Sequence, residues 1–271
     1  MKGIVLAGGT GSRLYPLTRV TNKHLLPVGR YPMIYHPVSK LAEAGIVDIL
    51  IVTGPSHMGD VVGVLGSGRD FGLHFTYKVQ DAAGGIAEAL GLADGFIQRD
   101  ESYVTVLGDN IFEDSIAPYV ERFAQQGGGA RILLKEVSDP NRYGVAVLDE
   151  GRIVAIEEKP KVPRSHLAVT GVYMYDHYAL EVAQTLQRSD RGELEITDVN
   201  NAYIRAGSLY YDILPGWWTD AGTLVSLTAA NRFAESLRLP IFDSHISVCT
   251  DHRPTEAVPR LGPNKTTPEA P

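Results

Sequence analysis

Three short apolar runs constrain the fold of this chain more than any other feature of its sequence. They occupy residues 3–7, 48–54 and 103–109, and they are rich in Val, Ile and Leu without polar alternation. Strands that are buried on both faces have this composition. Helix-like segments at 33–45 and 85–96 lie between them. Strand and helix in alternation predict an α/β fold, Rossmann-like, with a mostly parallel central sheet and helices on both of its faces.

The carboxyl ends of these strands predict the place of a ligand. Right-handed crossovers bring such ends to one edge of the sheet, where open α/β sheets bind their ligands. A glycine-rich loop follows the first run, and Asp109 closes the third. Both features therefore belong to the predicted ligand-binding edge.

The second half of the chain predicts a smaller, mixed lobe and a few packed helices. Strand-like runs joined by turns occur at 130–137, 143–149 and 152–160, and helices are expected at 178–187, 192–207 and 223–236. The end of the chain is rich in proline and lacks apolar periodicity, so 250–271 is expected to be a disordered tail.

Composition excludes several classes of function. The 271 residues are 44% hydrophobic, which is enough for one large core, and the net charge of −7 disfavours a nucleic-acid polymer as partner. Cys249 is the single cysteine, so no internal disulfide forms and a reducing compartment is expected. No run approaches the 18 to 20 apolar residues of a membrane span, nor does the N-terminus look like a signal peptide. We expect a cytoplasmic protein without a membrane partner.

The loop after the first run has the features of a phosphate-binding site. Its small residues allow backbone N–H groups to surround an anion, and Arg13 directly afterwards offers a forked donor. Lys23, ten residues further on, adds a point charge, so the segment suits a triphosphate. From the loop alone, a glycine turn with two solvated cations is an equally good interpretation. The loop residues expected to contact a nucleotide are Leu6, Gly8, Gly9, Thr10 and Gly11.

Two familiar phosphate loops do not fit this stretch. The dinucleotide fingerprint requires a third glycine, and Leu14 stands in its place. The P-loop requires a lysine after its last glycine, and Ser12 follows Gly11. A nicotinamide-dependent oxidoreductase is therefore disfavoured.

Eight segments in order resemble the sugar nucleotidyltransferase family. They are "LAGGTGSRLYPLT", "VQDAAGGIAEAL", "VLGDNIF", "YGVAVLD", "IEEKP", "TGVYMYD", "RGELEITDVNNAY" and "GWWTDAGT", and together they span roughly residues 1 to 235. Within this family the chain resembles most the branch that makes dTDP-glucose. The resemblance implies that dTTP and glucose 1-phosphate react to give dTDP-glucose and pyrophosphate, the start of dTDP-deoxysugar synthesis such as the rhamnose pathway. It also implies a homo-oligomer, commonly a tetramer, and the short form of the enzyme.

The resemblance implies a division of the chain. A single nucleotidyltransferase domain would cover residues 1–240, with a nucleotide-binding part at about 1–110 and a sugar-binding part at about 111–222. A C-terminal helix at about 223–239 would complete it.

Two aspartates are candidate magnesium ligands. Asp109 and Asp220 each neighbour a glycine, and each by itself is most simply a turn residue. Together with phosphate oxygens and water, two carboxylates make the hard octahedral site that Mg²⁺ prefers. The resemblance implies that both bind this ion.

The implied reaction requires no general base, because a sugar phosphate is already an anion near pH 7. Positioning and charge stabilisation would supply the catalysis. By resemblance, Arg13 stabilises the leaving pyrophosphate, and Lys159 with Arg191 holds the attacking phosphate. Read without the resemblance, Lys159 is a surface residue. Arg191 opposes the dipole of the helix expected at 192–207, which indicates some other purpose.

The remaining site residues follow from the resemblance. Gln80 and Gly85 would hold the thymine ring, because an amide donates to and accepts from a pyrimidine edge at once. Uracil presents the same edge, so UTP stays open as an alternative substrate, and so does another hexose 1-phosphate. A non-catalytic sugar-nucleotide-binding protein would be expected to lack Arg13 or a metal carboxylate, and all three are present. The residues expected around the sugar are Tyr143, Gly144, Glu158, Val169, Gly171 and Trp218.

Overall fold

A computed structural model of the chain describes residues 1–243, and the predicted tail and Cys249 lie outside these residues. The part described contains no helix that is long and apolar enough to cross a membrane. Its helices are α1 Tyr35–Glu43, α2 Met58–Leu65, α3 Ile86–Gly91, α4 Ala117–Gln126, α5 Tyr178–Thr185, α6 Ile196–Arg205 and α7 Leu224–Ala234. Its strands are β1 Lys2–Ala7, β2 Pro27–Val28, β3 Tyr31–Pro32, β4 Asp48–Thr53, β5 His74–Val79, β6 Tyr103–Leu107, β7 Asn110–Phe112, β8 Ala130–Glu136, β9 Gly144–Asp149, β10 Arg152–Glu158, β11 Leu167–Tyr175, β12 Leu209–Ile213 and β13 Trp218–Asp220.

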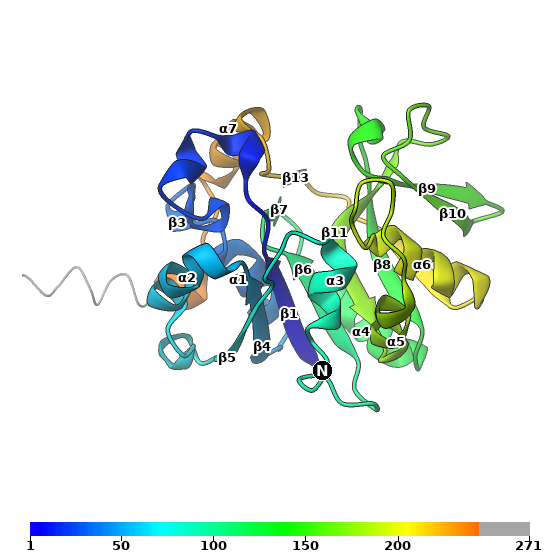
Figure 1. Ribbon diagram of the computed structural model, residues 1–271, viewed down its shortest axis with the longest axis horizontal. Coiled ribbons are helices and arrows are strands. Elements are labelled where there is room, and N and C mark those ends of the chain that lie inside the picture. Colours follow the sequence, from blue (N-terminus) through cyan, green and yellow to red (C-terminus); the bar gives the residue numbers. More distant parts are fainter. Residues whose placement is uncertain (244–271) are drawn as a thin grey trace, which may run out of the picture.

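One sheet of nine strands runs through both halves of the chain (Figure 1). The strands β6, β1, β4 and β5 are parallel neighbours, as the apolar runs predicted. On the other side of β6 the sheet continues through β11, which is antiparallel to it and also pairs with β8 and β9. The α/β fold with a parallel centre and a smaller mixed part is thereby confirmed.

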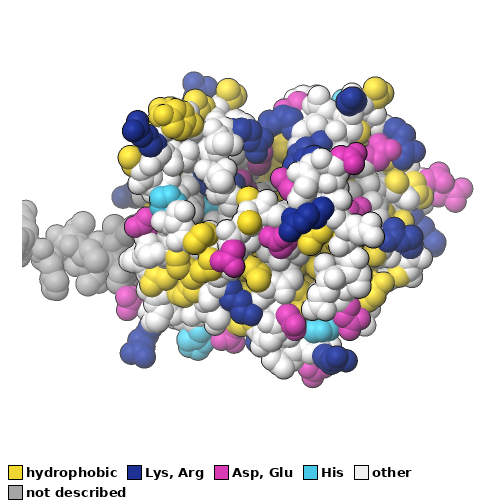
Figure 2. Space-filling model, in the orientation of Figure 1, with side chains coloured by type: hydrophobic (Ala, Val, Ile, Leu, Met, Phe, Trp, Pro, Cys, Tyr) yellow, Lys and Arg dark blue, Asp and Glu magenta, His cyan; other side chains and the backbone are white. Residues whose placement is uncertain are grey.

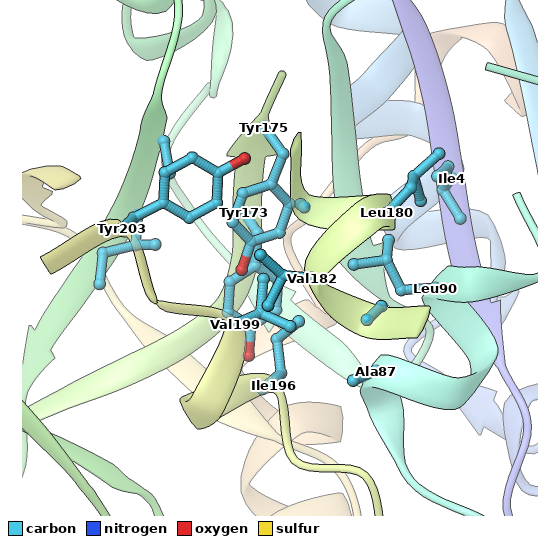
Figure 3. Close-up of a cluster of buried hydrophobic side chains, with 14 of the residues drawn as sticks. Ile4, Ala87, Leu90, Tyr173, Tyr175, Leu180, Val182, Ile196, Val199 and Tyr203 are labelled. Atoms are coloured by element: carbon cyan, nitrogen blue, oxygen red, sulfur yellow. The ribbon is translucent and has the colours of Figure 1, made fainter. Parts of the chain in front are cut away.

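Successive residues of β1 enter two different cores, because neighbouring side chains of a strand point to opposite faces. Ile4 and Leu6 pack with α3, α5 and α6 on one face. Val5 and Ala7 pack with α1, α2 and α4 on the other. Figure 3 shows the first of these cores, in which Ile4 and Leu90 lie near Leu180 and to which the tyrosines of β11 also belong. The sheet is therefore covered on both faces.

A third, smaller core brings α7 to the loops after β1. Leu14 packs there with Ala221 and with Leu227 of α7. The short strand β13 pairs with β7, with Asp220 opposite Asn110. A segment more than a hundred residues later in the chain is thus fixed beside the end of β6.

The structure corrects one helix boundary that bears on the site. The helix expected at 192–207 begins only at Ile196, because Gly192 has φ of 75° and Glu195 is still extended with ψ of 134°. The helix expected at 85–96 likewise ends at Gly91. The elements β5, β11, β12, α2 and α4 were not predicted from the sequence.

Candidate active site

A cleft of about 330 Å³ opens at the carboxyl ends of β1, β5 and β6, and β9 to β11 form its far side. Figure 2 shows it as a hollow in the upper part of the molecule, with charged side chains at its rim. Thr10, Gly11 and Arg191 are not among the residues that line it. The predicted residues that do line it are Leu6, Gly8, Gly9, Arg13, Lys23, Gln80, Gly85, Asp109, Tyr143, Gly144, Glu158, Lys159, Val169, Gly171, Trp218 and Asp220.

Two glycines of the loop, Gly9 and Gly11, have different structural roles. Gly9 faces the cleft with φ of 93°, a backbone conformation that favours glycine. Gly11 supports the loop instead, since its carbonyl accepts a hydrogen bond from Thr18 Oγ1 at 2.9 Å. A β-carbon on Gly11 would lie 2.7 Å from Thr18 Cγ2 and 3.1 Å from Lys23 Cβ. Glycine at this position therefore lets Lys23 approach the loop.

Two carboxylates and one guanidinium converge on a single point of the cleft. A β-carbon placed on Gly222 would lie 3.5 Å from Asp109 Oδ2, 3.5 Å from Asp220 Oδ2 and 3.2 Å from Arg13 Nη2. Asp109 follows β6 and Asp220 ends β13, so the pairing of β7 with β13 produces this arrangement. The missing side chain of Gly222 leaves space for a group that all three can contact.

Lys23 determines the charge of Asp109. Its Nζ lies 2.6 Å from Asp109 Oδ2, and the two side chains are 15% and 13% exposed. Burial by itself would raise the pKa of Asp109, but the nearby positive charge of Lys23 and its hydrogen bond hold the pKa at about 2. Asp109 is therefore an anion at neutral pH, ready to bind a cation.

Asp220 has a different environment. Burial and the negative charge of Asp109 raise its pKa, although Arg142 and Tyr143 oppose this effect. Arg142 Nη2 donates to Asp220 Oδ1 at 2.9 Å, and the Tyr143 hydroxyl donates to the same oxygen at 3.1 Å. Arg142 was not predicted as a site residue, because it lies in "DPNRYG", where the sequence indicated only a turn.

Asn110 connects both sides of the cleft and was also missed. Its Oδ1 accepts hydrogen bonds from Trp218 Nε1 at 2.6 Å and from the Gly171 backbone at 3.1 Å. Its Nδ2 donates to Asp109 Oδ1 at 3.2 Å. A β-carbon on Gly171 would lie 2.5 Å from Asn110 Nδ2, so glycine is required there. The signal in the sequence was its place beside Asp109 in "VLGDNIF".

Gln80 lies at the end of β5 beside the glycine loop. Its side chain is buried, and Nε2 donates to the Gly85 carbonyl at 3.2 Å and to Glu88 Oε1 at 3.1 Å. A β-carbon on Gly8 would lie 2.8 Å from Gln80 Oε1. Gly85 has φ of 107°, and a β-carbon on it would lie 2.4 Å from the Leu194 carbonyl. Backbone packing thus requires glycine at position 85, whereas a side chain at position 8 would have to displace the end of Gln80.

Glu158 and Lys159 stand on the opposite side of the cleft, at the end of β10. Glu158 Oε2 accepts from Thr197 Oγ1 at 2.6 Å, and Lys159 Nζ lies 3.1 Å from Glu158 Oε1. Lys159 has φ of 42°, a left-handed conformation that is costly for a residue with a β-carbon. Such strain occurs at functional sites more often than elsewhere. Its N–H donates to the Tyr143 carbonyl at 2.9 Å, which fixes this conformation.

Arg191 does not face the cleft. Its guanidinium pairs with Glu158 at 3.2 Å, Glu193 at 2.9 Å and Glu195 at 3.3 Å. The dipole argument for this residue was wrong, because α6 begins five residues later and Arg191 is not in its first turn. Its position indicates an indirect role through Glu158.

Within residues 1–243, no three side chains of His, Cys, Asp or Glu lie close enough together to hold a metal ion. A divalent ion between Asp109 and Asp220 would therefore take its other ligands from substrate and water. The nearby His24 is unsuited to the purpose, because it is buried and hydrogen-bonded through Nδ1 to Asn22 Oδ1 at 2.7 Å.

Comparison with known proteins gives one consistent family. The family described as "Nucleotidyl transferase" matches residues 2–236. A glucose-1-phosphate thymidylyltransferase of Neisseria meningitidis is 46% identical over 242 residues, which is 88% of this chain and 84% of that protein. The enzyme of the same name from Mycolicibacterium smegmatis is 42% identical over 243 residues, with the same coverage.

Solved structures have the same fold. A candidate glucose-1-phosphate thymidylyltransferase from Bacillus anthracis, crystallised with sucrose, is 60% identical, with a TM-score of 0.85 over 88% of this chain and 96% of that one. A UDP-glucose pyrophosphorylase in complex with UDP-glucose has a TM-score of 0.77 at 23% identity, over 88% of this chain and 99% of that one. The latter likeness concerns the fold alone.

Proposed function

Since the chain belongs to the nucleotidyl transferase family, we propose that it joins dTTP to glucose 1-phosphate, with dTDP-glucose and pyrophosphate as products. Relatives that carry the name of this activity are 42 to 46% identical over 88% of the chain. The single observation that carries the proposal is the convergence of Arg13, Asp109 and Asp220 on one point of the cleft. Gly8 and Gly9 of the glycine loop and Lys159 line the same cleft.

The reaction is an in-line displacement at the α-phosphorus of the triphosphate. A phosphate oxygen of the sugar 1-phosphate forms the new P–O bond, and the bond to the β-phosphate oxygen breaks. The attacking oxygen is already charged, so no side chain has to remove a proton. Lys159 holds the attacking phosphate, and Arg13 neutralises the departing pyrophosphate. The chain thus contributes position and charge rather than acid–base chemistry.

Asp109 and Asp220 are suited to bind Mg²⁺. Their Oδ2 atoms lie within 3.5 Å of one point, and hard carboxylate oxygens are the protein ligands that this ion prefers. When bound there, the ion polarises the α-phosphate and offsets the negative charge that develops on the leaving group. Lys23 holds Asp109 in place and Arg142 holds Asp220.

The two substrates occupy different parts of the cleft. Gln80, Gly85 and the loop from Leu6 to Arg13 bind the nucleotide, within a part that covers about 1–110. Tyr143, Glu158 and Trp218 bind the sugar, within a part that covers about 111–222. Residues of both parts line the same cleft, which supports its holding both substrates.

The test is to incubate the purified protein with Mg²⁺, glucose 1-phosphate and one nucleoside triphosphate at a time, and to measure pyrophosphate. Release with dTTP is expected, and absence of release would contradict the proposal. Equal release with UTP would broaden it to a general pyrimidine enzyme. The same mixtures without glucose 1-phosphate are the control, because plain hydrolysis of the triphosphate would not need the sugar.

A further inference from the structure

The side-chain amide of Gln80 is held in one orientation by two acceptors. Its Nε2 donates to the Gly85 carbonyl at 3.2 Å and to Glu88 Oε1 at 3.1 Å. A carbonyl and an ionised carboxylate accept hydrogen bonds and donate none. The amide nitrogen must therefore face them, and Oε1 must point the other way.

Arg188 keeps Glu88 charged and in place. Arg188 Nη2 donates to Glu88 Oε2 at 2.5 Å, and its Nη1 donates to the Gly192 carbonyl at 2.8 Å. Burial would raise the pKa of Glu88, but hydrogen bonds from Gln80 and Arg188 lower the pKa below its usual value. Glu88 is thus an anion at neutral pH, and a rotated Gln80 amide would set an oxygen against it.

Gly84 makes room for this carboxylate. A β-carbon on Gly84 would lie 2.0 Å from Glu88 Oε2, a distance that is too short for two non-bonded atoms. The backbone of Gly84 is outside the left-handed region, and the three atoms nearest to such a β-carbon all belong to the Glu88 carboxylate. The glycine is therefore matched to the glutamate four residues later.

The other end of the amide is open to the cleft. Among the described residues, no hydrogen bond to Gln80 Oε1 occurs, and Oε1 is not one of their buried atoms without a partner. It lies beside Gly8 of the phosphate-binding loop, and both residues line the cleft. A ligand in the cleft therefore meets an acceptor at this position.

We propose that the Glu88–Arg188 pair is a positioning device that makes Gln80 present its oxygen to the base, so that the site selects bases with an imide N–H. Thymine and uracil have such an N–H between two carbonyls, whereas cytosine has a ring nitrogen that is itself an acceptor. This inference rests on the proposed function and specifies how its nucleotide is chosen. Glu88 acts through Gln80 and does not contact the substrate.

The test compares dTTP with dCTP in variants of this pair. Glu88→Gln keeps the size of the side chain but can donate as well as accept, so the Gln80 amide can rotate. The ratio of kcat/KM for dTTP over dCTP is expected to fall about tenfold, the cost of one unsatisfied buried polar group. Gly84→Ala displaces the carboxylate and is expected to lower the ratio similarly. The double variant should lower it no further than the larger single effect.

Glu101→Gln is the matched control. Glu101 is 32% exposed and pairs with Lys2 at 2.7 Å, whereas Glu88 is 26% exposed. The control should keep the wild-type ratio. Should Glu88→Gln fail to fold, Arg188→Met removes the cation from the pair and tests the same expectation.

An equal fall of kcat/KM for both nucleotides, with the ratio unchanged, would show that Glu88 only supports the loop and would overturn the inference. No pyrophosphate from dTTP in the wild-type protein would instead overturn the proposed function, and this inference with it. The two failures are therefore distinguishable in one set of assays.

Discussion

Asp109 and Asp220 face one point of the cleft, yet their pKa values shift in opposite directions. Lys23 keeps the pKa of Asp109 at about 2, whereas burial and the charge of Asp109 raise the pKa of Asp220. Lys23 therefore compensates the charge of Asp109 more fully than Arg142 and Tyr143 compensate that of Asp220. A bound divalent cation would relieve the repulsion that remains.

We expect Asp220→Asn to lower turnover about 100-fold. The substitution removes a negative charge that would bind the divalent cation, and this cation would stabilise the charge on the transferred phosphate. Stability should be retained, since a buried carboxylate with a raised pKa contributes little to it. Initial rates of pyrophosphate release and thermal unfolding would be measured together. Near-normal turnover would exclude Asp220 as a metal ligand.

Stability should also depend on His36, which is buried with its Nε2 at 3.0 Å from the Val28 carbonyl. Burial lowers its pKa from 6.5 to about 4, so the folded state resists protonation. Below pH 6.5 the unfolded chain takes up a proton that the folded chain does not. The free energy of unfolding should then fall by up to about 1.4 kcal/mol per pH unit until pH 4.

Urea unfolding at pH 7, 6 and 5 measures this effect. His36→Gln keeps a donor for the Val28 carbonyl but does not titrate, so its stability should depend less on pH than that of the wild type. Parallel pH profiles for the two proteins would contradict the assignment. His24, whose pKa is lowered to about 3 by burial, remains in both proteins and contributes equally.

At the scale of elements, α7 is capped at its start by its own residues and is fixed to the rest of the molecule further along its length. Thr223 Oγ1 accepts from the Ser226 backbone at 3.1 Å, and Ser226 Oγ accepts from the Thr223 backbone at 3.0 Å. Asn231 then accepts from the Gly29 backbone at 3.0 Å. The helix directly follows Asp220 and Gly222, so it helps to position the carboxylate.

Thr223→Ala should destabilise the protein by about 1 kcal/mol, because it removes the acceptor for the Ser226 N–H and the contact between the Thr223 and Ser226 hydroxyls. Thr228→Ala is the control, since Thr228 is exposed and its hydroxyl only donates to the Leu224 carbonyl of the preceding turn. The control should change stability by less than about 0.5 kcal/mol. Equal effects of the two substitutions in urea unfolding would contradict a special role for the cap.

At the scale of the whole molecule, the packed core continues beyond the end of the family match. The family match stops at residue 236, but Leu239 and Phe242 are still buried in the core with Tyr31 and Val38. The Phe242 ring stacks on Tyr35 with centroids 3.8 Å apart. None of the residues that line the cleft lies beyond Asp220. The last part of the described chain thus serves stability rather than chemistry.

We expect truncation after residue 245 to leave activity intact, because the buried side chains up to Phe242 remain. Truncation after Arg238 should cost about 5 kcal/mol, since it removes two large side chains from the core. Thermal unfolding and pyrophosphate release would be measured for both proteins. An inactive longer truncate would show that the segment after 245 has a role in the reaction, and equal stability of the two would contradict the packing argument.

The sequence by itself determined the parallel centre of the sheet, the glycine loop and most of the residues that line the cleft. Buried strands and turn glycines leave such patterns because each depends on a few neighbouring residues, as in 3–7 and in Gly9. The sequence was less informative about the start of α6, where extended residues precede the helix. It therefore misjudged the position of Arg191.

Only the tertiary structure decided which side chains act together. Arg142 meets Asp220 across 78 residues of chain, and Arg188 meets Glu88 across 100. No local pattern marks such a pair, because the contact depends on how the sheet and the two ends of the cleft are assembled. The same holds for Gly222, because Arg13 and Asp109 from distant segments approach the space that its missing side chain leaves open. Residue types predicted the chemistry, and packing determined its geometry.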